Sequence, residues 1–145
     1  MLTPAEYFAL LLAVCAYAFA AGRTDERSVA AICIGASLGS VAVMSPLTSR
    51  YSHVEAGVFI VDLATFVGFT IVALRSERFW PLWVAGLQLT TLMSHGIKLG
   101  RIDLMPHAYA AAARFWVYPI FLIIVIATWR GVRRRRALHS QAVAA

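Results

Sequence analysis

The chain has 145 residues, of which 61% are hydrophobic and only 14% are charged, and its formal net charge is +6. A water-soluble domain of this length needs a far more polar surface, so the composition excludes an ordinary soluble protein. The apolar residues fall in continuous blocks of roughly 16 to 20, close to the length of helix that crosses a hydrocarbon core. Because these blocks do not alternate with polar residues, we expect transmembrane helices.

The blocks predict an all-α, polytopic bundle of five transmembrane helices that forms a single domain over residues 1–136. The first helix starts with a capping box, in which Thr3 is the N-cap, Pro4 follows and Glu6 lies three residues after the cap. The last helix is expected to kink at Pro119. The predicted spans are about 4–22, 28–44, 54–74, 79–97 and 108–129, followed by a disordered cytoplasmic tail at 137–145.

The basic residues orient this bundle. If the N-terminus lies outside, nine of them fall on the cytoplasmic side: Arg23, Arg27, Arg75, Arg78, Arg130, Arg133, Arg134, Arg135 and Arg136. Four fall on the outer side: Arg50, Lys98, Arg101 and Arg114. Because cytoplasmic segments carry the excess of positive charge, we expect an outer N-terminus and a cytoplasmic C-terminus. Cleavage of the first helix as a signal peptide is the alternative, but it would leave the arginine-rich C-terminus outside.

The five arginines that follow the last block, Arg130 and Arg133 to Arg136, predict a cytoplasmic anchor in contact with anionic lipid. Nucleic acid is not an expected partner, because no aromatic side chains interleave these arginines. Four tryptophans and two tyrosines near the predicted interfaces are typical of an aromatic belt.

Polar side chains gather at one depth within the apolar blocks. Asp62 lies in the run GVFIVDLATFVGF, roughly 20 Å from the cytoplasmic end of its helix. Residues of the fourth and fifth helices reach a similar depth, and Gln88, Thr91 and His95 share one helical face. The predicted polar layer comprises Asp62, Gln88, Thr91, His95, Arg114 and Tyr118.

A carboxylate inside a membrane is tolerated when it is paired or faces water. We therefore expect Asp62 to face the bundle interior and to contact Thr91, His95, Arg114 or Tyr118. Such a layer either fixes helix register or serves a proton relay or ligand pocket. A protonated Asp62 that plays neither part is the third possibility, because desolvation favours the neutral carboxyl group, and the sequence leaves its charge state open.

The second helix carries small residues at Ala31, Gly35 and Gly39, a spacing that lets two helices approach closely. The partner helix is either another part of the same chain or a second subunit. Cys15 and Cys33 form no CxxC or metal-binding pattern and are expected to behave as small buried hydrophobes.

No catalytic, metal or cofactor motif is present. The sequence lacks a Walker loop, GxGxxG, GxSxG and any nucleophile–base pair. His and acidic residues on the outer side lack the spacing of a metal site, and a bis-His haem is not expected because only His95 is clearly inside a helix. The outer residues considered are His53, Glu55, His95, Asp103 and His107. We therefore predict no metal and no cofactor.

The segments RSERFWPLWVAGLQL, SHGIKL and FWVYP resemble a group of small inner-membrane proteins of alphaproteobacteria that have no characterised activity. The matching features are Asp62, Arg78, the run Trp80 to Trp83, His95, and the pair Tyr118 and Pro119. The resemblance extends over about residues 55–129. It implies a bacterial inner membrane and no particular chemistry.

The sequence favours an accessory subunit or homo-oligomer of the inner membrane, without catalytic machinery of its own. A small transporter or proton-handling channel that uses the Asp62 layer is the first alternative. A feature against it is the lack of a polar path in the inner half, where the third helix offers only Thr65 and Thr70. A lipid- or quinone-binding enzyme subunit, built on His95, Arg114 and Tyr118, is the second alternative.

Overall fold

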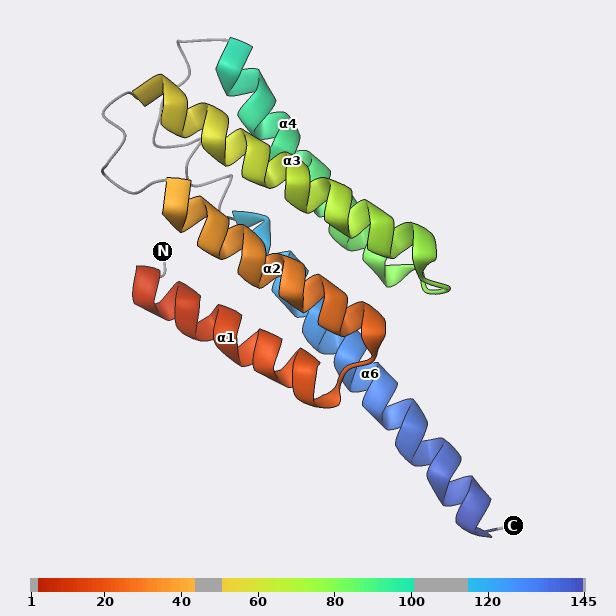
Figure 1. Cartoon of the computed structure of the whole chain (residues 1–145). Coiled ribbons are helices and arrows are strands. Elements are labelled where there is room, and N and C mark those ends of the chain that lie inside the picture. Colours follow the sequence, from red (N-terminus) through yellow and green to blue (C-terminus); the bar gives the residue numbers. More distant parts are fainter. Residues whose placement is uncertain (1–2, 44–50, 101–114, 145) are drawn as a thin grey trace.

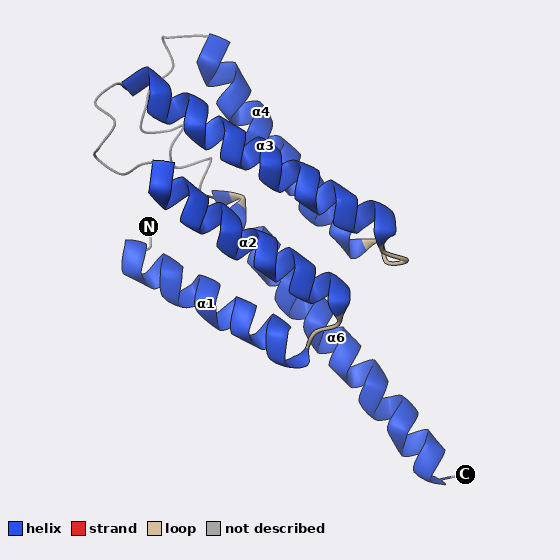
Figure 2. Ribbon diagram, viewed as in Figure 1, coloured by secondary structure: helices blue, strands red, loops and turns tan. Residues whose placement is uncertain are grey.

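The computed structural model describes residues 3–43, 51–100 and 115–144, with side chains described at 3–43, 57–94 and 115–142. All regular structure in these ranges is helical, which confirms the predicted all-α class (Figures 1 and 2). The helices are α1 (Pro4–Ala21), α2 (Thr24–Val43), α3 (Tyr51–Arg75), α4 (Trp80–Gly100) and α6 (Val117–Ala144).

Three stretches among the described residues are long and apolar enough to cross a membrane: α1, α2 and Gly57–Arg75 of α3. Large hydrophobic side chains lie on their outer surface, including Leu12, Ile60 and Leu74, which is 78% exposed. Such a surface is suited to lipid, because contact between apolar side chains and acyl chains carries no hydration cost.

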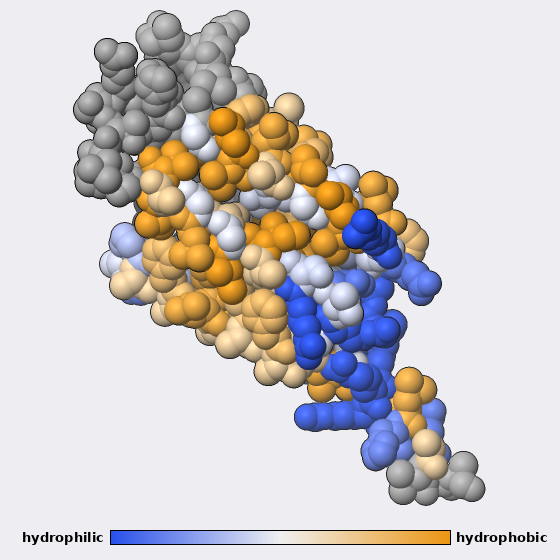
Figure 3. Space-filling model, in the orientation of Figure 1, coloured by the Kyte–Doolittle hydropathy of each residue, from blue (hydrophilic) through white to orange (hydrophobic). Residues whose placement is uncertain are grey.

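Two helical hairpins, α1–α2 and α3–α4, are joined by close packing of α2 on α3, while α6 packs against α1, α2 and α4. The core contains Cys15 and Val29 of the first hairpin, Phe69 and Val84 of the second, and Ile124 of α6. The α1–α2 turn, the α3–α4 turn and the basic part of α6 lie at the same end of the bundle (Figure 1). We call this the charged end, and Figure 3 shows hydrophilic side chains gathered there.

The helix starts follow from local capping. The capping box predicted at α1 is confirmed, since Glu6 Oε2 accepts from Thr3 N at 2.6 Å and Thr3 Oγ1 accepts from Glu6 N at 3.3 Å. α2 starts at Thr24, earlier than the predicted residue 28. The cause is Glu26, whose Oε2 accepts from the backbone N–H of Arg23 at 2.9 Å and so caps the earlier start.

α6 differs from the prediction at its C-terminal end. Pro119 lies in its first turn, where a proline removes no helical hydrogen bond, and Phe115 just before it is helical and Trp116 forms a turn. The part of the predicted span before residue 115 lies outside the described residues, so the kink at Pro119 stays a prediction. The helix continues to Ala144, through most of the segment expected to be a disordered tail. The residues after Gly131 are mainly Arg, Ala, Leu and Gln, which favour helix, and include no Gly or Pro to end it.

Candidate functional site

Asp62 of α3 and Gln88 of α4 form a polar contact between two helices inside the bundle. Gln88 Nε2 donates to Asp62 Oδ1 at 3.1 Å and lies 3.4 Å from the backbone oxygen of Asp62. Gln88 is only 5% exposed, so the bond joins two helices away from water. A hydrogen bond between transmembrane helices contributes about 0.6 kcal/mol on average and up to about 1.7. The pair can therefore fix how α3 and α4 lie against each other.

The other residues of the predicted polar layer have different surroundings. Thr91 is buried, and its hydroxyl donates to the Leu87 carbonyl of its own helix at 3.4 Å. Tyr118 is half-buried in the first turn of α6. Arg114 and the side chain of His95 lie outside the described residues. Asp62 accepts a hydrogen bond from Gln88, another member of the layer, and its expected contact with Thr91, His95, Arg114 or Tyr118 stays a prediction.

The small residues of α2 divide between two roles. A Cβ added at Gly39 would lie 3.4 Å from the Val61 side chain of α3, so Gly39 serves packing within the chain. Gly35 is exposed, and a Cβ built there meets no heavy atom within 4 Å. Ala31 is exposed as well. Among the described residues, these two therefore offer a surface that is open to a close helix contact.

An open groove runs beside this surface between α2 and α3. Its volume is about 270 Å³, and its walls are mostly small or β-branched: Ile32, Gly35, Ala36, Gly39, Val61, Ala64, Thr65 and Gly68. The two helices come close because α3 also presents glycines. A Cβ at Gly68 would lie 3.2 Å from Ile32, and one at Gly57 would overlap Val43. The groove is thus the shallow seam of a tight helix pair.

A polar network at the charged end was not predicted from the sequence. Glu26 at the start of α2 is 1% exposed, and its Oε1 accepts from Arg78 Nη1 of the α3–α4 turn at 2.8 Å. Beside it, Ser76 Oγ donates to Asp25 Oδ2 at 2.7 Å and accepts from Arg78 N at 3.2 Å. The first turn of α2 and the turn between α3 and α4 thus bind each other and hold the two hairpins together.

The basic anchor of α6 begins where that helix passes this network. Gly131 is buried, and a Cβ there would lie 4.0 Å from both Arg78 Nη1 and Glu26 Oε1. Arg133 lies over the Trp129 ring at 4.9 Å, and Arg135 Nη2 donates to the carbonyl of Ala21 at the end of α1. Arg130, Arg134 and Arg136 are exposed.

The other candidate ligand groups in the sequence are His, Cys and acidic side chains. No group of three His, Cys, Asp or Glu side chains in the described part of the chain is placed to hold a metal ion. The outer residues considered from the sequence, His53, Glu55, His95, Asp103 and His107, have side chains outside that part. Cys15 and Cys33 are both buried and free, and Cys15 Sγ donates to the Ala30 carbonyl at 3.6 Å.

Comparisons with protein-family models, with curated proteins and with solved structures give no match to this chain. The resemblance to small alphaproteobacterial membrane proteins therefore stays a prediction. The described features that can bear on function are the groove between α2 and α3, the pair Asp62 and Gln88, and the charged end.

Proposed function

We propose that the protein is a multi-pass protein of a bacterial inner membrane that works by helix association, with no catalytic machinery of its own. Its partner is a second copy of the same chain, which docks through α2. The observation that carries this proposal is the open position of Gly35, exposed at the edge of the α2–α3 groove with no atom within 4 Å of an added Cβ.

The chemistry of lipid explains why this position supports association. Between transmembrane helices there is no hydrophobic driving force, so close backbone approach and dispersion contacts drive pairing. Ala31 and Gly35 lie one turn apart on the exposed face of α2. Two copies related by a twofold axis would place these residues against their own equivalents, which is the self-complementary contact that a homodimer requires.

The rest of the fold supports a structural role for the polar residues. The Asp62–Gln88 bond holds α4 on α3, and the Glu26–Arg78 pair holds the second hairpin on the first. α2 packs against α1, α3 and α6, and these contacts hold the helix that carries the exposed face in place. A rigid face loses little conformational freedom on binding, which favours association.

The native mass in mild detergent tests this proposal. Gly35→Leu would place a branched side chain on the docking face, and the wild-type dimer mass should fall to that of one chain, with at least a tenfold weaker association. Gly86→Leu is the matched control, because Gly86 is also an exposed helical glycine with no atom within 4 Å of an added Cβ. A dimer that survives Gly35→Leu, or a wild-type monomer in detergent and in bilayers, would refute a homodimer through α2. A larger mass that contains a second protein would replace the homodimer with an accessory-subunit role.

We also propose five spans with the N-terminus outside and the C-terminus in the cytoplasm. The support is that the α1–α2 turn, the α3–α4 turn and the basic part of α6 lie at one end of the bundle (Figure 1). These segments and the adjoining helix ends carry Arg23, Arg27, Arg75, Arg78 and the α6 arginines. Reporter fusions test it: a C-terminal fluorescent protein should fold and fluoresce, and a C-terminal periplasmic phosphatase should stay inactive. The reverse pattern would overturn the orientation.

A further inference from the structure

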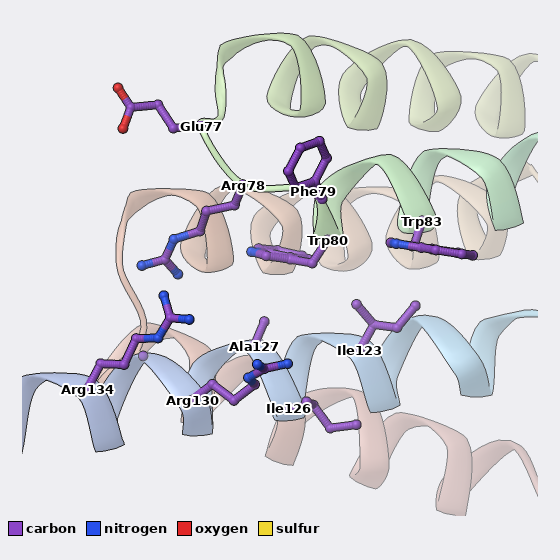
Figure 4. A pocket seen from close by; sticks show the side chains of 11 residues that line it. Glu77, Arg78, Phe79, Trp80, Trp83, Ile123, Ile126, Ala127, Arg130 and Arg134 are labelled. Carbon is purple, nitrogen blue, oxygen red and sulfur yellow. The ribbon is translucent and has the colours of Figure 1, made fainter.

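A second cavity lies at the charged end, between the start of α4 and the basic part of α6. Its volume is about 530 Å³, within the usual range for small-molecule sites. α4 and the turn before it contribute Arg78, Trp80 and Trp83, and α6 contributes Ile123, Arg130 and Arg134. Figure 4 shows the tryptophans on one wall and the α6 side chains on the other.

The α6 wall changes from apolar to cationic along the helix axis. Ile123, Ile126 and Ala127, Arg130 and Arg134 follow one another at spacings of three or four residues, so they share one face. From Ile123 to Arg134 this stripe is about 16 Å long. The opposite wall also changes from apolar to cationic in the same direction, from Trp83 to Arg78. The cavity therefore has an apolar part toward the middle of the bundle and a cationic part toward the charged end.

Two of the three arginines in the cationic part have no counter-charge among the described side chains. Arg78 is paired with Glu26 at 2.8 Å. Within the described side chains, Arg130 and Arg134 make no ion pair and no hydrogen bond. Glu77 belongs to the lining, but Figure 4 shows its carboxylate directed away from the two α6 arginines, while Arg134 points toward Arg78. Like charges brought together in this way favour an anion between them.

The apolar part decides which kind of anion fits. The side chains that border the cavity are strongly exposed on the outer surface, with Phe79 at 78%, Trp83 at 70% and Ile126 at 43%. In a bilayer this flank meets acyl chains, and tryptophan is the side chain enriched at headgroup level. A free phosphate or nucleotide would use the arginines and leave this flank without a partner.

We infer that the cavity between α4 and α6 is a binding site for an anionic phospholipid. Arg130 and Arg134 hold the headgroup phosphate, and the first carbons of the acyl chains lie along Trp83 and Ile126. Basic pockets beside transmembrane helices on the cytoplasmic side are suited to such headgroups. The site is separate from the α2–α3 groove, so it does not depend on the proposed dimer.

The test titrates the full chain in a neutral detergent with short-chain phosphatidylglycerol. The readouts are the unfolding temperature and the lipid retained in native mass spectra. Phosphatidylcholine of the same chain length and glycerol phosphate serve as comparison probes. We expect phosphatidylglycerol to stabilise the wild type and to stay bound, with weaker effects from both other probes. Equal stabilisation by phosphatidylcholine would overturn headgroup recognition, and equal stabilisation by glycerol phosphate would make this a site for free phosphate.

Charge variants separate this cavity from diffuse attraction to a basic helix. The double variant R130Q/R134Q should weaken phosphatidylglycerol binding at least tenfold. The control R133Q/R136Q removes the same charge from residues outside the cavity and should keep most of the affinity. Equal losses in the two variants would refute a defined site. Ile126→Trp leaves every arginine in place and fills the apolar part, so wild-type binding in that variant would refute the acyl-chain placement, whether or not R130Q/R134Q folds.

Discussion

Arg78→Met should lower the free energy of unfolding more than most single substitutions at the charged end. It should be clearly more destabilising than Glu26→Gln, which removes the charge of its partner. Glu26 is 1% exposed, whereas the Arg78 side chain is 28% exposed. Without Arg78, the buried Glu26 carboxylate keeps one described hydrogen-bond donor, the backbone N–H of Arg23. Breaking a buried ion pair in this way costs about 3–5 kcal/mol. Glu26→Gln leaves a partly hydrated guanidinium and a neutral acceptor, so about 1–2 kcal/mol is expected.

The double variant Glu26→Gln/Arg78→Met removes both charges, and apolar or neutral replacement of a buried ion pair is often close to neutral. It should therefore recover about 2 kcal/mol relative to Arg78→Met alone. The free energy of unfolding is measured by reversible denaturation in mixed micelles of a mild detergent and dodecyl sulfate, followed by circular dichroism. If Arg78→Met costs less than about 1 kcal/mol, or the double variant is as unstable as that single variant, the pair does not hold the two hairpins together.

Three further perturbations probe other parts of the bundle. Gln88→Met should destabilise the fold by about 0.6–1.7 kcal/mol in the same assay, because it removes the donor to Asp62; no loss would show that this bond does not fix α3 on α4. Gly22→Ala should lower the free energy of unfolding by about 1–3 kcal/mol, because the new Cβ would overlap the Ala18 carbonyl and lie 2.9 Å from Glu26 Cβ. The control Gly86→Ala should stabilise its helix, because a Cβ at that position meets no atom within 4 Å. Cys15 and Cys33 should react with maleimide far more slowly in the folded protein than in dodecyl sulfate, since both are buried, and equal rates would contradict the packing of α1 on α2.

The features that sequence could predict are local ones. The capping box at Thr3 and Glu6 depends on four consecutive residues, and long apolar blocks identify helices without any knowledge of their neighbours. The start of α2 was missed because TDER was treated as a loop. The end of α6 was missed because a tail without tertiary contacts was expected to fray, although its residues favour helix.

Contacts between helices were harder to predict because they depend on crossing angles. The sequence placed Asp62 and Gln88 in one layer, but depth was counted along parallel axes, which favoured Thr91 as the neighbour on α4. The structure brings in Gln88, one turn closer to the charged end. The Glu26–Arg78 pair was missed for a related reason: its residues lie in the first turn of α2 and in the α3–α4 turn, 52 positions apart. Opposite charges in two short polar segments, TDER and RSER, on the same predicted side of the membrane were the signal that could have found it.

The end of α6 has a consequence for anything attached to the C-terminus. From Arg130 to Ala144 the chain is one continuous helix, about 21 Å long, that projects past the other helices (Figure 1). A label or fused domain placed there is attached to a helix and not to a flexible linker. Each residue deleted between 137 and 144 would bring it about 1.5 Å closer to the bundle and turn it by about 100° around the helix axis. The distance and direction of a C-terminal probe can therefore be set by counting residues.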